Sequence, residues 1–105
     1  EYDDARRCYL DSDRLEFPLE VRNRRPGDRY QPAGMRGQKK LKELFRERKI
    51  SREERDWVPV FVSAGQIVWV PGLPVAENFK VTSETKKIFV IEMLREKNER
   101  EKGDT

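Results

Sequence analysis

The sequence has no histidine and a single cysteine, Cys8. A lone cysteine cannot form an internal disulfide, and without histidine or a second cysteine the usual zinc ligands are missing. Histidine is also the commonest general base, so none of the serines has the partner that activates a serine nucleophile. We therefore expect this chain to hold no metal and to have no catalytic site of its own.

The sequence also has no long hydrophobic run and no secretory signal pattern at its start. Its longest apolar stretches, such as residues 88–91, are far shorter than the roughly 20 residues that cross a bilayer. We expect a cytoplasmic location and no membrane partner. Because the first residue is Glu1 rather than Met, we interpret the chain as a piece of a longer protein.

Hydrophobic residues are scarce for a folded protein, at 35%, whereas charged residues reach 41%. Ten aromatic residues and several short apolar runs nevertheless argue against full disorder. A chain of 105 residues has the length of one domain with a modest core. We predict a folded domain over residues 15–93. A linker with a first strand precedes it over 1–14, and a polar, poorly ordered tail follows over 94–105.

The positive charge is concentrated in residues 22–42, which we call the basic segment. It carries eight Arg or Lys side chains against a single acid, Asp28, a net charge of +7. Residues 1–20 carry a net charge of −4 and residues 43–105 are neutral overall, so the formal charge of +3 conceals this concentration. Proline and glycine interrupt the first part of the segment, which predicts a loop with fixed turns.

Such a dense cationic cluster has two interpretations. A run of charge is often only a solvated surface. Cations with almost no acid beside them repel one another, however, and a polyanion relieves that repulsion when its phosphates are neutralised. We therefore favour nucleic-acid binding. Within the loop, Pro26 and Gly27 predict a type II turn, and Asp28 is expected to orient a neighbouring arginine rather than to act as a catalytic carboxylate.

Short apolar runs, most of them alternating with polar residues, predict six strands. They span residues 7–10, 15–21, 58–62, 66–70, 79–82 and 87–93. The last is apolar on both faces, as in a strand buried within a sheet, and the third and fourth have the spacing of a hairpin. After residue 38, Leu41, Leu44 and Phe45 recur at helical spacing. Ser51 and Glu54 have the form of a capping box, which predicts a short second helix.

The expected architecture is thus α+β, with a small mixed or antiparallel sheet, one amphipathic helix and a short helical turn. Three aromatic residues, Tyr30, Trp57 and Trp69, are candidates for stacking on nucleic-acid bases. For the two tryptophans, a place in the hydrophobic core is the favoured interpretation.

Several motifs together resemble one known family. The longest is Arg-Arg-Pro-Gly-Asp-Arg-Tyr-Gln-Pro-Ala-Gly-Met at residues 24–35, and Lys-Lys-Leu-Lys-Glu-Leu-Phe follows at 39–45. Further motifs are Lys-Ile-Ser-Arg-Glu-Glu-Arg at 49–55, Ile-Val-Trp-Val-Pro-Gly at 67–72 and Phe-Lys-Val-Thr at 79–82. The pattern is similar to the C-terminal domain of tRNA(Ile)-lysidine synthetases over about residues 15–92. That domain is similar in fold to a module of phenylalanyl-tRNA synthetase beta chains.

The resemblance implies a specific parent enzyme. Members of the family use ATP, with Mg²⁺, to adenylate the first anticodon cytidine of the isoleucine tRNA that carries a CAU anticodon, and lysine then displaces AMP to give lysidine. That chemistry belongs to an N-terminal catalytic domain with a Ser-Gly-Gly-x-Asp-Ser pyrophosphate loop, which does not occur in this sequence. The fragment is therefore expected to bind no cofactor and not to be an enzyme alone, whereas its parent is a tRNA-modifying ligase.

The resemblance also implies a role in substrate recognition, because the C-terminal domain of this family contacts the acceptor stem of tRNA(Ile). Pro26, Gly27 and Asp28 would shape the binding loop. The phosphates and groove of the stem would be contacted by seven basic residues: Arg22, Arg24, Arg25, Arg29, Lys39, Lys40 and Lys42.

The expected partners are the acceptor stem of tRNA(Ile), the catalytic domain of the same chain and, in a homodimer, a second copy of the protein. One alternative stays open. In it, the basic face pairs with acidic surface on its own enzyme, so that the domain docks and orients the catalytic part without contacting tRNA.

Overall fold

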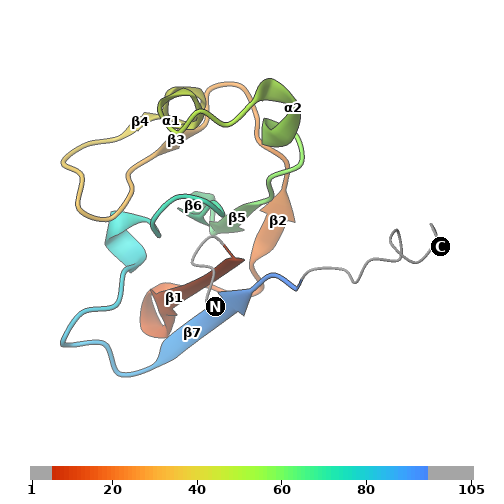
Figure 1. Cartoon of the computed structure of the whole chain (residues 1–105). Helices are drawn as coiled ribbons and strands as arrows, with labels where there is room; N and C mark the ends of the chain where they lie inside the picture. Colours follow the sequence, from red (N-terminus) through yellow and green to blue (C-terminus); the bar gives the residue numbers. More distant parts are fainter. Residues whose placement is uncertain (1–5, 95–105) are drawn as a thin grey trace.

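Figure 1 shows the chain as a computed structural model that describes residues 6–94. Over these residues the fold is α+β, as predicted, with small antiparallel sheets, short helices and single-turn 3₁₀ helices. The strands are β1 (Arg7–Asp11), β2 (Glu20–Arg22), β3 (Arg29–Tyr30), β4 (Lys39–Lys40), β5 (Val60–Ser63), β6 (Gln66–Trp69) and β7 (Ile88–Glu92). The helices are α1 (Leu41–Glu47) and α2 (Arg52–Arg55), and the 3₁₀ helices are η2 (Ser12–Arg14) and η3 (Glu77–Phe79).

The sheets follow one another along the molecule. Strands β3 and β4 lie with α1 and α2 at one end, β1 and β7 lie at the other, and β2, β5 and β6 lie between them (Figure 1). Residues 1–5 of the expected linker and residues 95–105 of the expected tail lie outside the described residues, so their character stays a prediction.

The predicted hairpin is the centre of the fold. β5 pairs with β6, with Val62 opposite Ile67, and β2 pairs with the other edge of β5, so the order is β2-β5-β6. The turn between the two hairpin strands has positive φ at both central residues, 46° at Ala64 and 83° at Gly65. This combination is typical of the tight turns whose twist matches that of the strands they join.

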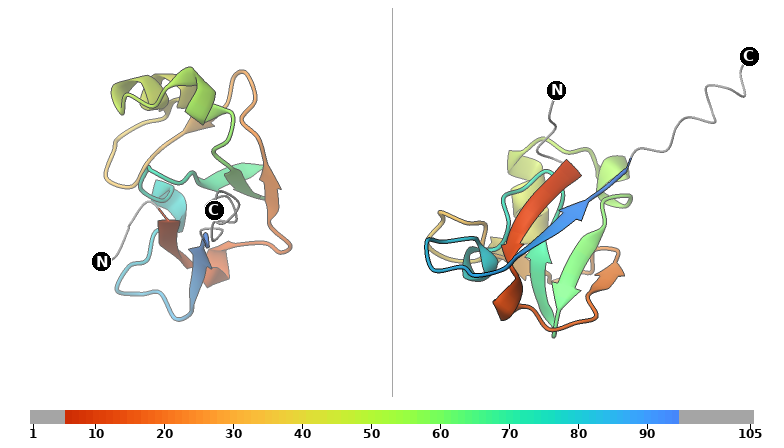
Figure 2. Two further views of the ribbon diagram at one scale, coloured as in Figure 1. Left: turned by 45° about the vertical axis from the view of Figure 1, so that its right-hand side comes forward. Right: turned by 90° about the horizontal axis from the view of Figure 1, so that it is seen from below.

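Strands β1 and β7 form a two-stranded antiparallel ribbon, seen side by side in both views of Figure 2. Both strands were predicted, but the expectation that β7 is buried on both faces is wrong. Ile88 is 54% and Val90 46% exposed, whereas Phe89 and Ile91 between them pack against the core. Tyr9, which lies opposite Val90 on β1, is 45% exposed as well, so one face of the ribbon lacks a covering layer within residues 6–94.

The predicted strand over residues 15–21 is largely wrong, because only its end enters a sheet as β2. At Glu16 the backbone groups bond to a side chain instead of a neighbouring strand. Its N–H donates to the Ser63 hydroxyl oxygen at 2.8 Å, and that hydroxyl donates to its carbonyl at 3.2 Å. Pro18 has no N–H to offer a ladder. The alternating pattern therefore reflects burial of Leu15 and Leu19 along an irregular segment.

Helix α1 was expected to follow residue 38, and it begins at Leu41 because Lys39 and Lys40 pair with β3. Its apolar stripe of Leu41, Leu44 and Phe45 is buried, as the spacing predicts. The short helix α2 was also predicted correctly, together with its capping box. No helix among residues 6–94 combines the length and the apolar character that crossing a membrane needs.

The predicted strand over residues 79–82 is wrong. The chain there passes from η3, whose Phe79 is buried, into a turn held by hydroxyl groups. The N–H of Thr82 donates to the side-chain oxygen of Thr85 at 2.9 Å, and the N–H of Glu84 donates to that of Thr82 at 3.1 Å. Such local side-chain bonds satisfy the backbone without a partner strand.

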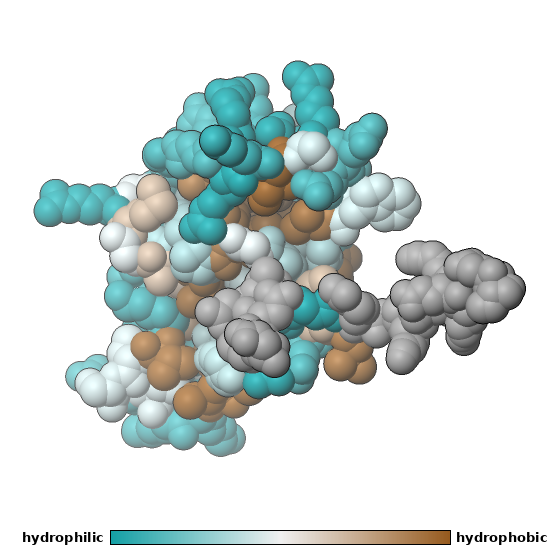
Figure 3. Space-filling view, in the orientation of Figure 1, coloured by the Kyte–Doolittle hydropathy of each residue, from teal (hydrophilic) through white to brown (hydrophobic). Residues whose placement is uncertain are grey.

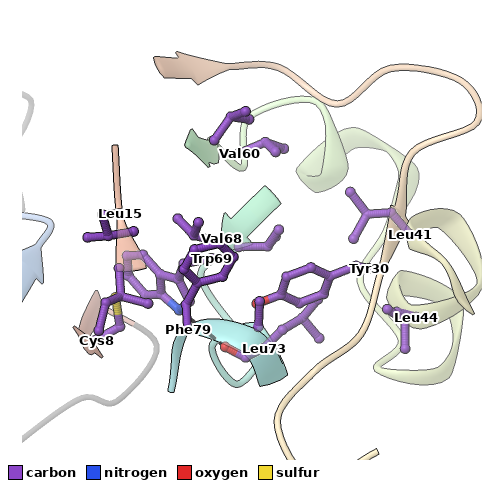
Figure 4. Packing of buried hydrophobic residues seen from close by; sticks show 14 of the residues in the cluster. Cys8, Leu15, Tyr30, Leu41, Leu44, Val60, Val68, Trp69, Leu73 and Phe79 are labelled. Carbon is purple, nitrogen blue, oxygen red and sulfur yellow. Dashed lines mark hydrogen bonds between the residues drawn. The ribbon is translucent and has the colours of Figure 1, made fainter. Parts of the chain in front are cut away.

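The core joins the central hairpin to α1 and to the segment after β6 (Figure 4). Trp69 is buried, as favoured, and its indole N–H donates to the Leu73 carbonyl at 3.2 Å. Tyr30 is buried beside it with its hydroxyl donating to the Pro74 carbonyl at 2.6 Å. The favoured interpretation of Trp57 as a core residue is wrong, because this side chain is 84% exposed after α2.

Candidate nucleic-acid interface

The basic segment folds back on itself, so that cations from its two ends lie close together. The pairing of β3 with β4 sets Arg29 opposite Lys40. The N–H of Leu41 at the start of α1 donates to the backbone carbonyl of Asp28 at 2.9 Å, which fastens the helix to the loop. Figure 3 shows hydrophilic side chains gathered over this end of the molecule, where α1 and α2 lie.

Asp28 is the anchor of the loop. Its carboxylate accepts two hydrogen bonds from Arg22, from Nη1 at 3.0 Å and from Nη2 at 3.1 Å, and a third from the backbone N–H of Arg25 at 2.8 Å. Both partners of the ion pair are largely buried, with 14% of the Arg22 side chain and 12% of the Asp28 side chain exposed. Burial alone would raise the pKa of Asp28, but the bonds and charges of Arg22 and Arg25 lower it below its usual value.

The turn that precedes Asp28 has the form expected from Pro26-Gly27. The N–H of Asp28 donates to the Arg25 carbonyl at 3.1 Å, and Gly27 has a φ of 87°. A glycine with positive φ at the third position is the signature of a type II turn, because other residues rarely adopt that conformation. The turn holds Arg25 at the surface while Asp28 points inward to Arg22.

Several cations of the basic segment are engaged in ion pairs. Arg24 pairs with Asp56 at 3.1 Å, and Lys39 pairs with Glu47 at 2.6 Å. Arg25 reaches only to 3.8 Å from Glu20, with more than half of both side chains exposed. Exposed pairs contribute little and are easily exchanged for another anion, so these three cations remain accessible whereas Arg22 does not.

Four exposed cations of the basic segment have no ion pair within residues 6–94. They are Arg29, Arg36, Lys40 and Lys42. Arg36 was not among the seven predicted contact residues. Its charge was visible in the sequence, but its lack of a partner depends on the folded surface.

The two ends of the basic segment enclose a surface hollow of about 410 Å³, which we call the cationic hollow. Arg24 and Arg25 contribute from the loop, and Lys40 and Lys42 contribute from β4 and α1. Pro26, Gly27, Asp28, Leu41 and Asp56 complete the lining. Two arginines and two lysines around one hollow can hold an anion such as a phosphate, the arginines through a fork of donors and the lysines as point charges.

The other sequence candidates have different surroundings. Tyr30 and Trp69 are buried and cannot stack on a base, whereas Trp57 is accessible beside Asp56. Burial raises the pKa of the Cys8 thiol to about 12, which keeps it protonated and unreactive at neutral pH. Among the described residues, no group of three His, Cys, Asp or Glu side chains is placed to hold a metal ion.

The chain matches the profile of a family described as the TilS substrate C-terminal domain over residues 19–93. It is 47% identical over 88 residues to a tRNA(Ile)-lysidine synthase of Caldanaerobacter subterraneus, covering 84% of this chain and 19% of that protein. It is 42% identical over 87 residues to a bifunctional TilS/HprT protein of Listeria monocytogenes, covering 82% of this chain and 13% of that protein. The chain thus spans about a fifth or less of the length of these relatives.

Solved structures agree with this match. A TilS C-terminal domain crystal structure superposes with a TM-score of 0.71 at 36% identity, covering 90% of this chain and 76% of that one. An N-terminal fragment of the phenylalanyl-tRNA synthetase beta subunit from Pyrococcus horikoshii gives a TM-score of 0.63 at 18% identity, over 80% of this chain and 26% of that one. The second likeness is one of fold alone. The chain belongs to the family of TilS substrate C-terminal domains, found in tRNA(Ile)-lysidine synthases.

Proposed function

We propose that this chain is the tRNA-binding domain of a tRNA(Ile)-lysidine synthase, and that its basic segment holds the acceptor stem of tRNA(Ile). The observation that carries the proposal is the cationic hollow, where Arg24, Arg25, Lys40 and Lys42 converge. Two of these four cations have no ion pair among the described residues, and the other two have only exposed ones. A polyanionic ligand supplies the missing countercharge.

An acceptor stem suits this surface for physical reasons. It is an A-form duplex, whose deep and narrow major groove excludes side chains, so that proteins contact its phosphates, 2′-hydroxyls and wide minor groove. Each phosphate that a Lys or Arg neutralises releases counterions and strengthens binding in a salt-dependent way. Exposed cations on a loop and on the neighbouring start of a helix offer several such contacts within one patch.

The geometry divides the seven predicted contact residues into three groups. Arg29, Lys40 and Lys42 are assigned as direct phosphate contacts, because they are exposed and have no ion pair within residues 6–94. Arg24, Arg25 and Lys39 contact phosphate by exchanging a surface carboxylate for it. Arg22 keeps its pair with Asp28 and acts by holding the loop in shape.

The proposal extends to the whole protein. The parent uses ATP, with Mg²⁺, and lysine to convert the first anticodon cytidine of tRNA(Ile) to lysidine in the cytoplasm. Its chemistry takes place in a catalytic domain elsewhere in the same protein, and the present domain contributes the choice of tRNA. No catalytic role is assigned to the residues described above.

The docking alternative predicts the same basic surface but a different ligand, an acidic patch on the parent enzyme. A homodimer would add a second copy of the domain as a further partner. Binding by the separate 105-residue chain distinguishes the two functions, because a tRNA-binding domain retains salt-dependent RNA affinity by itself whereas a docking module does not.

The experiment is titration of the chain with tRNA(Ile) and with a version that carries the acceptor stem of methionine tRNA, each over a salt series. We expect tighter binding of the first tRNA and a negative slope of log affinity against log salt. Changing Arg24, Arg25 and Arg29 to Ala should shallow that slope by roughly one unit per lost phosphate contact. Negligible binding of both tRNAs would contradict the proposal and favour docking.

A further inference from the structure

A second hollow, of about 270 Å³, shares Gly27 and Asp28 of the turn with the cationic hollow. Its walls come from β3, from the approach to β4, from the tip of the central hairpin and from η3. The side chains in these walls include Gln38, Gln66 and Asn78, so we call it the amide hollow. Arg29, an exposed cation without an ion pair in the described structure, lies on its rim.

The three amides share one property that sets them apart. Residues 6–94 contain five Asn or Gln side chains. Asn23 donates to the Asp56 carbonyl at 3.1 Å, and Gln31 donates to the Met35 carbonyl at 2.7 Å. The other three have exposed side chains with no hydrogen bond to any described residue, and all three lie in this one hollow.

Their convergence is not a consequence of neighbouring positions in the sequence. Gln38, Gln66 and Asn78 belong to three segments that only the tertiary fold brings together. An amide carries a donor group and an acceptor oxygen on one plane. Three of them around a hollow offer a neutral set of donors and acceptors. Hydroxyls and base edges can use both kinds of group, whereas a phosphate oxygen can only accept.

The acids of the amide hollow are already compensated, so they do not repel a nucleic acid. Asp28 is held by Arg22 and by the N–H of Arg25. Glu77 binds Lys80 at 2.8 Å and accepts the Gly34 N–H at 2.8 Å. Those two interactions, the lysine first, lower the pKa of Glu77. The remaining free charge of the lining is that of Arg29.

We propose that the amide hollow determines which RNA this domain selects. Gln38, Gln66 and Asn78 donate and accept hydrogen bonds at 2′-hydroxyls and base edges in the minor groove of the duplex whose phosphates occupy the cationic hollow. Gly27 and Asp28 line both hollows, so one duplex laid across the turn reaches the two together. Phosphates position a duplex and carry no sequence information, whereas contacts to base edges do. The inference rests on the proposed function and adds to it the residues that supply selectivity.

The test compares the triple variant Gln38→Ala, Gln66→Ala, Asn78→Ala with the original chain on two RNA hairpins, one with the acceptor stem of tRNA(Ile) and one with that of methionine tRNA. The preference for the first hairpin should fall roughly tenfold, since each hydrogen bond is worth about two- to tenfold in affinity. The salt slope should be unchanged, because no cation is removed. A third hairpin carries 2′-fluoro groups in place of the 2′-hydroxyls of the isoleucine stem, which keeps the A-form but removes the hydroxyl donors. Its affinity for the original chain should fall, whereas its affinity for the triple variant should change little.

Two control variants complete the design. Ser83→Ala removes an exposed polar side chain outside the hollow and should leave the preference intact. Lys40→Ala with Lys42→Ala should weaken both hairpins alike and shallow the salt slope while the preference persists. The exposed positions of all these residues predict unchanged folding, checked by thermal denaturation.

The outcomes separate the two proposals. Absence of binding by the original chain would contradict the proposed function itself. Binding without any preference between the hairpins, or a preference that the triple variant retains, would overturn the role of the amide hollow and leave phosphate binding in place. A steeper or shallower salt slope in the triple variant would also count against it, because neutral side chains release no counterions.

Discussion

The two ends of the molecule differ in how closely their unpaired cations are grouped. In the ribbon of β1 and β7, Arg7 lies opposite Glu92 and donates a hydrogen bond to its carboxylate at 2.9 Å. The charges of these two side chains therefore neutralise each other. At the end with β3, β4 and α1, exposed cations such as Lys40 and Lys42 have no such partner among the described residues. The ribbon end has two exposed cations without an ion pair among the described residues, Lys86 and Lys87, and its strands expose apolar side chains such as Ile88 and Val90.

This contrast shows what the high charge content of the chain means. Charged residues make up 41% of the sequence, which by composition alone indicates only a very polar surface. The structure separates charges that stabilise the protein's own contacts from charges that lack a partner. Unpaired charge of one sign that is grouped on one surface marks a candidate binding surface, whereas paired charge belongs to the protein's own contacts. Variants that change one end at a time test this difference.

The largest effect is expected from the buried charge pair of Arg22 and Asp28 at the basic end. Asp28→Ala leaves Arg22 largely buried without its carboxylate and frees the Arg25 N–H. We expect a loss of about 3 kcal/mol in the free energy of unfolding, measured by urea denaturation. Glu20→Ala, which removes an exposed contact of 3.8 Å to Arg25, is the control and should change stability by less than about 0.5 kcal/mol. If the two substitutions lowered the free energy of unfolding equally, the buried pair would stabilise the fold no more than an exposed pair does.

The same pair should make stability depend on acid. The pKa of Asp28 is lower in the folded chain than in the unfolded one, where it is about 3.9. Its contribution is therefore complete above the unfolded value and is lost as pH falls through the folded value. The stability difference between the original chain and Asp28→Asn should be constant from neutral pH to about pH 5 and should shrink below about pH 4. A difference that persists undiminished at pH 2 would argue against the ion pair.

The two ends can be compared directly through matched lysine pairs. Lys40→Ala with Lys42→Ala and Lys86→Ala with Lys87→Ala each remove two exposed cations, the second pair just before β7. Only the first should weaken tRNA binding, with a salt slope shallower by roughly two units. Neither should alter the melting temperature appreciably. If both doubles weaken binding equally, net charge rather than the basic surface determines affinity.

The smallest effect is expected at the ribbon. Glu92→Gln removes the carboxylate charge opposite Arg7, but the two side chains are 46% and 33% exposed. Surface pairs of this kind contribute about 0.2–1 kcal/mol, so stability should fall by no more than that, and less at high salt. Binding of tRNA should be unchanged. A loss of binding would place the ribbon in the RNA interface and remove the contrast between the two ends.

Local patterns in the sequence predicted the parts of the fold that local physics controls. The hairpin of β5 and β6 has apolar strands around a Gly-containing turn, α1 has a buried stripe at helical spacing, and α2 has its capping box. Each of these depends on residues within a few positions of one another. The class of the fold could be predicted from them.

The errors concern segments whose state depends on distant partners. Residues 15–19 alternate like a strand but are held by the hydroxyl of Ser63, far along the chain. Strands β3 and β4 have two residues each and no alternation to detect. Nothing in the sequence around Trp57 indicates that its side chain is exposed. Its position depends on where α2 ends, which is at the surface.

The candidate site was predictable in position but not in detail. Charge density places the cations on residues 22–42. Which of them are free depends on contacts with Asp56 and Glu47, residues that the charge count does not connect to Arg24 and Lys39. The amide hollow left no signal in the sequence, because Gln38, Gln66 and Asn78 occur in unrelated contexts and meet only in the folded chain.

The turn of Gly27 and Asp28 forms a common wall between the two hollows. Asp28 also ties that wall to β2 through Arg22 and to α1 through the Leu41 N–H. Because both hollows share these residues, a movement of the turn changes the shape of both. Tightness of binding and fidelity of choice would then be thermodynamically linked. A substitution in this turn that raises the affinity for phosphate should lower the preference between the two tRNAs. In a double-mutant cycle, changes in the two hollows should therefore have free energies that do not add.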